Sequence, residues 1–117
     1  MTEEVYVFRE EVDPLTVGEK RQTIRYAGEI IEVRVAFPDG QAETMQLRPL
    51  LEKSRGVRED LFHYAGDDAF VSGDGVQYKA PVRVRCHPSD VLVLEYENVS
   101  DTYERSAICD VVVRGDA

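Results

Sequence analysis

Two-residue alternation of apolar and polar side chains is the feature that most restricts the fold of this chain. It is strongest in two β-branched runs, residues 91–98 and 107–114, which a polar loop separates. A period of two places successive side chains on opposite faces of a β-strand, whereas a helix requires a period near 3.6. Both runs are therefore predicted to be strands, and their closeness along the chain predicts that they pair as a hairpin.

The same alternation recurs in residues 4–13, 29–37, 43–48 and 76–86, and shorter strands are predicted at residues 20–26 and 60–64. In 29–37 it predicts that Ile31, Val33, Val35 and Phe37 share the buried face. Residues 49–56 fit either one or two helical turns or a loop. About eight short strands separated by turns predict an all-β fold, a single antiparallel β-sandwich of jelly-roll or Greek-key type spanning residues 1–117.

The N-terminal segment, residues 1–13, is predicted to be an extended arm or an edge strand. Large apolar groups occur on both of its faces, so one face packs on the chain's own sheet or on a neighbouring subunit. The candidate interface residues are Tyr6, Phe8 and Val12. Removal of residues 1–13 is then expected to reduce assembly and to leave the sandwich folded.

Composition excludes several classes of partner. The chain of 117 residues has a net charge of −9, with 23 acidic against 14 basic residues, and no cluster of cations suited to phosphate is present. No apolar stretch approaches the roughly 18 residues of a membrane span. We therefore expect one domain that binds neither nucleic acid nor membrane.

The basic residues comprise eleven arginines but only Lys20, Lys53 and Lys79. An acidic, lysine-poor composition resembles that of proteins from salt-loving archaea and their viruses, where salt screens repulsion between like charges. An acidic protein from a GC-rich genome fits equally well. The N-terminal residues Met1-Thr2-Glu3-Glu4 lack the features of a secretion signal, which predicts synthesis in the cytoplasm of the host cell.

A glycine-bearing loop contains three acidic residues, Asp67, Asp68 and Asp74. Carboxylates are ligands that calcium prefers, so this loop is a candidate cation or ligand site. Asp also forms turns by accepting hydrogen bonds from its own backbone, and this interpretation requires no metal.

No group of residues fits a catalytic site. Cys86 and Cys109 lie in predicted strands and are expected to be buried thiols, with a disulfide left open. Neither has the spacing of a metal ligand. Alternation places Cys86 and His87 on opposite faces, and Glu95 and Glu97 on one solvated face. We predict that the protein is not an enzyme and needs no cofactor.

Several turn and strand signals occur in a fixed order between residues 20 and 114. They are a Gly-initiated strand at 28–37, a Pro-x-Gly turn at 38–40, a Ser-Gly-Asp loop at 72–74, and an Asn-x-x-Asp corner at 98–101. This order resembles small β-sandwich accessory and decoration proteins in the virions of tailed viruses. The resemblance implies a non-enzymatic virion component, associated with a capsid or tail, that assembles with itself and with other virion proteins.

Two functional hypotheses therefore stand. The first is a structural protein of a virion that forms symmetric oligomers through its sheet edges and residues 1–13. The second is a module that binds carbohydrate, or a ligand through a cation, using Tyr64, Asp67, Asp68 and Tyr103.

Overall fold

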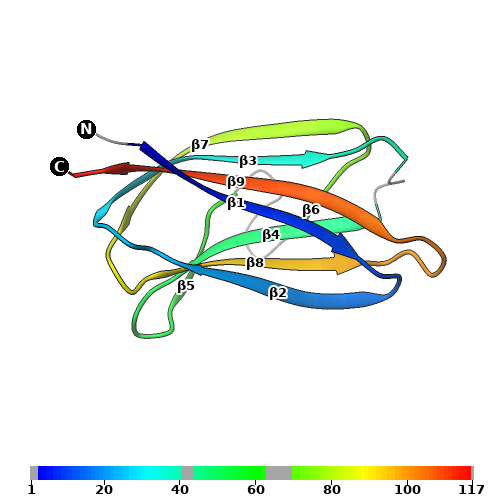
Figure 1. Cartoon of the computed structure of the whole chain (residues 1–117), viewed down its shortest axis with the longest axis horizontal. Coiled ribbons are helices and arrows are strands. Elements are labelled where there is room, and N and C mark those ends of the chain that lie inside the picture. Colours follow the sequence, from blue (N-terminus) through cyan, green and yellow to red (C-terminus); the bar gives the residue numbers. More distant parts are fainter. Residues whose placement is uncertain (1–2, 41–43, 63–69, 117) are drawn as a thin grey trace.

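The computed structural model describes residues 3–40, 44–62 and 70–116. These residues form nine β-strands and no helix, which confirms the all-β prediction (Figure 1). The strands are β1 (Glu3–Val12), β2 (Thr16–Thr23), β3 (Gly28–Phe37), β4 (Met45–Glu52), β5 (Arg58–Asp60), β6 (Val71–Ser72), β7 (Val76–Cys86), β8 (Val91–Asn98) and β9 (Arg105–Gly115). A helix that would be long and apolar enough to cross a membrane is not found among the described residues.

The strands form two antiparallel sheets packed face to face. One sheet has the order β1-β9-β3-β7, and the other has the order β2-β8-β4-β5, with β6 also paired to β4. First and last strands are neighbours in the first sheet, and successive strands repeatedly cross between sheets, which is the topology of a jelly roll. The predicted antiparallel sandwich is therefore confirmed.

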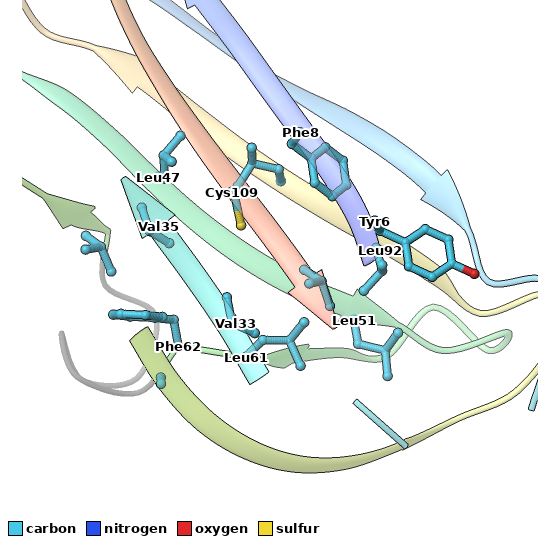
Figure 2. Packing of buried hydrophobic residues seen from close by; sticks show 14 of the residues in the cluster. Tyr6, Phe8, Val33, Val35, Leu47, Leu51, Leu61, Phe62, Leu92 and Cys109 are labelled. Atoms are coloured by element: carbon cyan, nitrogen blue, oxygen red, sulfur yellow. The ribbon is translucent and has the colours of Figure 1, made fainter. Parts of the chain in front are cut away.

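Strands β8 and β9, however, do not form the predicted hairpin. β8 pairs with β2 and β4 in one sheet, and β9 pairs with β1 and β3 in the other. The connection between them crosses from sheet to sheet, so their inward side chains meet in one core. Figure 2 shows part of this core, which contains Tyr6, Phe8, Val33, Val35, Leu47, Leu51, Leu92 and Cys109.

Strand β1 is an edge strand, paired with β9 along its whole length. The register runs from Glu3 opposite Arg114 to Val12 opposite Arg105 without a shift. Tyr6, Phe8 and Val12 face inward and are nearly inaccessible. Residues 1–13 therefore supply core side chains and the partner of β9, and their removal is expected to unfold the sandwich rather than leave it intact.

A β-bulge in β3 changes which isoleucine is buried. The register of β3 with β7 and β9 shifts between Ile30 and Glu32, so Ile30 enters the core and Ile31 is only half-buried. Val33, Val35 and Phe37 are buried as predicted. A bulge inserts one residue into the ladder and reverses the faces on one side of it.

Two segments that contain proline are continuous strands. Residues 49–52 continue β4, so neither a helical turn nor a loop begins at Pro49, and the chain turns only after Glu52. β7 runs through Pro81 without interruption. Because β7 is the edge of its sheet, the missing N–H of Pro81 is tolerated there.

Candidate interaction surface

A buried asparagine organises one end of the sandwich. Asn98, at the end of β8, has no exposed surface. Its side-chain Nδ2 donates hydrogen bonds to the carbonyl oxygens of Val12 at 2.9 Å and Tyr103 at 2.9 Å, with Asp13 at 3.3 Å. Its Oδ1 accepts a bond of 3.0 Å from the N–H of Ser100. One side chain thus joins the end of β1, the β1–β2 turn and the β8–β9 loop.

Ser100 adds further bonds between the same segments. Its carbonyl oxygen accepts a hydrogen bond of 3.0 Å from the backbone N–H of Leu15. Its Oγ accepts bonds from the N–H groups of Thr102 and Tyr103, at 3.3 and 3.1 Å. These loops are therefore fixed by buried and half-buried bonds.

Leu15 has an unusual backbone conformation in this arrangement. Its φ angle is 54°, in the left-handed region, which costs a residue with a Cβ about 1–2 kcal/mol. The side chain nevertheless points into solvent, with 69% of its surface exposed. Bulky apolar residues with positive φ are rare outside turns and functional sites.

Three more large apolar side chains are exposed in or next to the segments that Asn98 and Ser100 connect, one in β2 and two in the β8–β9 loop. Val17 is 68% exposed, Tyr103 61% and Val99 44%. The four residues Leu15, Val17, Val99 and Tyr103 are called the loop-end patch below. Single exposed apolar residues are common; these four are considered together because the bonds of Asn98 and Ser100 join the β1–β2 turn to the β8–β9 loop at this end of the sandwich.

The interface residues predicted in β1 do not lie on the surface. Tyr6, Phe8 and Val12 are buried in the chain's own core, because the alternation that makes β1 a strand turns these residues inward. The exposed apolar residues of β1 are Val5 and Val7. The exposed apolar side chains of β1 therefore lie on the opposite face from the predicted interface residues.

A hollow of about 600 Å³ lies at the other end of the sandwich, beside the start of β1 and the end of β9. Tyr6, Tyr26, Glu3, Glu4 and Asp116 contribute to its lining. Hydrogen bonds from the Tyr6 hydroxyl and the guanidinium of Arg25 lower the pKa of Glu4. The hollow thus combines tyrosine rings with carboxyl groups.

The outer face of the β2-β8-β4-β5 sheet contains a network of ion pairs. Arg48 contacts Asp60 at 3.0 Å and Glu95 at 3.1 Å, and Arg58 contacts Glu52 at 3.0 Å and Glu95 at 3.3 Å. Glu95 lies on an outward face, as predicted, and its carboxylate pairs with two arginines. This face is best explained as a stabilising network across several strands.

The predicted cation loop falls mainly on residues 63–69, so Asp67, Asp68, His63 and Tyr64 lie outside the described residues. Asp74 is described, and its Oδ1 accepts a hydrogen bond of 2.7 Å from the N–H of Gly40. It therefore connects two turns. Among residues 3–40, 44–62 and 70–116, no group of three His, Cys, Asp or Glu is placed to hold a metal ion.

The two cysteines are separate buried thiols. Cys86 and Cys109 are both free and inaccessible, which confirms the expectation of buried thiols. Burial raises the pKa of each thiol, so neither is activated as a nucleophile. His87, by contrast, is exposed in the turn between β7 and β8.

The strand order and packing define the chain as a jelly-roll β-sandwich. Among solved structures it is similar to the crystal structure of the Yersinia pseudotuberculosis-derived mitogen YPM. The TM-score is 0.57 at 9% sequence identity, over 97% of this chain and 89% of that chain. At this identity the likeness shows the fold alone. No protein-family model and no curated protein sequence matches the chain.

Proposed function

We propose that the protein is a non-enzymatic interaction module that forms symmetric oligomers and binds a protein partner through the loop-end patch. The main support is Leu15, which has a positive φ angle in the β1–β2 turn and a side chain that is 69% exposed. Nothing in the packing of the core requires an exposed leucine at this turn.

The bonds around Asn98 and Ser100 also favour a binding role. They fix the loops before a partner arrives, so association orders few groups and loses little conformational entropy. Apolar and aromatic side chains on a rigid surface are typical of residues that dominate binding energy. Tyr103 fits this pattern, with the guanidinium of Arg105 lying 5.2 Å from the centre of its ring.

The narrower proposal is that this module is a virion component, associated with a capsid or tail. It is supported by the order of turn and strand signals in residues 20–114, and an all-β sandwich is compatible with that role. In this role the other virion proteins are the partners of the loop-end patch.

Site-specific photocrosslinking tests the proposed surface. A photoreactive phenylalanine is placed at Tyr103 in one variant and at Val57 in a control, because Val57 is equally exposed, at 64%, but lies in the β4–β5 turn. In cells that produce the protein naturally, we expect one discrete crosslinked partner from position 103 and none from position 57. Equal crosslinking from both positions, or none from either, contradicts the proposal.

A second candidate function, a carbohydrate-binding module, is favoured by the hollow at the opposite end. Tyrosine rings and carboxylates are groups that bind sugar faces and hydroxyls, and both line this hollow. A glycan array with the wild-type protein and the Tyr26→Ala variant tests it. Specific binding that this variant loses favours the module, and an array without signal rejects it.

A further inference from the structure

The four-stranded sheet ends in β1, and this edge differs from the other sheet edges that the structure describes. β7 contains Pro81 and three exposed cationic residues, β2 contains Lys20 and Arg21, and β5 and β6 have three and two residues. Proline, lysine and short length are the devices that prevent pairing at an edge. β1 has ten residues, contains neither proline nor lysine, and pairs with β9 without a bulge.

The odd-numbered residues of β1 are the ones directed at a neighbour. The carbonyl oxygen of Val7 accepts a bond of 2.8 Å from the side-chain amide of Gln22, so it points away from β9. In an antiparallel ladder, residues two apart direct their backbone groups to the same side. Glu3, Val5, Val7 and Arg9 therefore offer their backbone groups to the open edge, and their side chains are exposed.

We propose that two copies of the chain pair antiparallel through β1, about a two-fold axis at Tyr6. In this register Val5 faces Val7 of the second copy, and Glu3 faces Arg9 of the second copy. The two four-stranded sheets join into one continuous sheet of eight strands. The proposal rests on the proposed role in assembly and identifies the surface between copies.

Charge and polarity distinguish this register from the two nearest alternatives, in which the two-fold axis lies at Val5 or at Val7. An axis at Val5 sets Glu3 opposite Val7. Shifting the axis to Val7 sets Glu3 opposite Glu11 and Val5 opposite Arg9. Like charges and unlike polarity in cross-strand positions are unfavourable, whereas opposite charges and apolar pairs are favourable. Arg9 has no ion pair within the described part of the chain, and Glu3 contacts Arg114 only at 3.6 Å, so both are available to each other across the axis.

Dimer formation must displace the side chain of Gln22 from the open edge of β1. Its amide occupies the carbonyl oxygen of Val7 in the single chain, and the N–H of Val5 in the second copy replaces it after pairing. The hydrogen bond to Val7 is thereby exchanged rather than lost. A shorter side chain at position 22 leaves the edge open.

The mass of the full-length protein in solution tests the proposal by sedimentation velocity over a concentration series. We expect the wild type to reach twice its monomer mass of 13.3 kDa. Val7→Lys places a charge at the centre of the contact and is expected to keep the protein monomeric. Its thermal unfolding temperature should remain within a few degrees of the wild type, because Val7 is exposed.

Charge reversal tests the register. Glu3→Arg and Arg9→Glu each weaken the dimer at least several-fold, and the double variant restores it. Glu11→Arg, the matched control, leaves it unchanged. Gln22→Ala strengthens the dimer. A monomeric wild type, or a dimer that neither Arg9→Glu nor Val7→Lys weakens, overturns the proposal.

The loop-end variant Leu15→Asp separates this proposal from the proposed function. It should leave the β1 dimer intact while abolishing the crosslink to the partner. If Leu15→Asp abolishes the crosslink and the wild type is monomeric, the loop-end surface is supported and the β1 pairing is rejected. If the wild type forms a dimer of the expected register but gives no crosslink, the β1 pairing is supported and the loop-end surface is rejected.

Discussion

The side-chain amide of Gln22 in β2 lies 2.8 Å from the backbone carbonyl oxygen of Val7 in β1. The bond joins the edge strands of the two sheets on one side of the sandwich, and β1 and β2 converge toward the turn that connects them (Figure 1). It satisfies one carbonyl of an otherwise open edge and limits uncontrolled strand pairing. An edge that is closed by a single removable side chain suits reversible association better than a fully blocked or a fully open one.

Asn98→Ala is expected to lower the free energy of unfolding by about 3 kcal/mol, because the substitution leaves buried backbone groups of Val12 and Tyr103 without partners. Urea unfolding followed by circular dichroism measures the change. Thr102→Ala, at an exposed position in the same loop, should change stability by at most about 0.5 kcal/mol. Equal effects of the two substitutions would show that Asn98 does not hold this end together.

Phe8→Ala is expected to destabilise the protein by about 3–5 kcal/mol, since it leaves a cavity in the shared core of the two sheets. Its exposed neighbour Val7 provides the control, and Val7→Ala should change the free energy of unfolding by well under about 1 kcal/mol. Urea unfolding of both variants at the same protein concentration measures the two changes in the free energy of unfolding. If Phe8→Ala were nearly neutral, β1 would be a dispensable arm after all.

Acidification is expected to destabilise the fold through Glu52. Hydrogen bonds from Arg21 and Arg58 hold the pKa of Glu52 below its ordinary value of 4.5. A carboxyl group whose pKa is lower in the folded state stabilises that state above the unfolded pKa. This contribution is lost as the pH falls through the folded value. Urea midpoints measured between pH 7 and pH 3 should fall most steeply below pH 4.5.

Glu52→Gln is the control for this pH dependence. It removes the ionisable group, so the slope of stability against pH below 4.5 should become shallower, although Asp116 and Glu4, whose pKa values are also lowered, retain part of it. An unchanged slope would assign the acid sensitivity to other carboxyl groups.

The thiols of Cys86 and Cys109 are expected to resist Ellman's reagent in the folded protein. Burial raises the pKa of both thiols and excludes the reagent. Both should react after unfolding in urea. Val57→Cys, in an exposed turn, should react at once and shows that the reagent is active. Rapid reaction of the wild type under native conditions would indicate that the sandwich opens locally.

Alternation along the sequence was sufficient to predict the long strands and many of their faces, whereas β6 was expected to be part of a loop and β2 and β5 begin earlier than predicted. Val33, Val35 and Phe37 are buried because the two-residue period of β3 is regular over that stretch. Ile30 and Ile31 were assigned to the wrong faces, because the bulge beside them depends on the register with β7 and β9. Local alternation contains no information about such a partner.

Strand partners were less predictable than faces for the same reason. β8 and β9 are close in sequence and similar in pattern, yet they belong to different sheets. A six-residue loop fits a hairpin and a crossover equally well. The choice is made by the whole topology, in which β1 and β3 occupy the two sides of β9.

The loop-end patch was only partly visible in the sequence. The turn at Asp13-Pro14 and the corner at Asn98 have clear signals, and Tyr103 was a candidate ligand-binding residue. The exposure of Leu15, however, depends on its positive φ angle and on its bond to Ser100. Both are consequences of a contact between segments more than eighty residues apart.

Glu3 lies opposite Arg114 at one tip of the elongated molecule, and Val12 lies opposite Arg105 toward the other. The start of β1 thus lies beside the end of β9, and the body extends 46 Å along its long axis. A fluorophore, affinity tag or surface linker attached beside Glu3 or Arg114 would leave Leu15 and Tyr103 on the far tip unobstructed. The fold therefore permits oriented immobilisation, with every copy presenting the same tip outward.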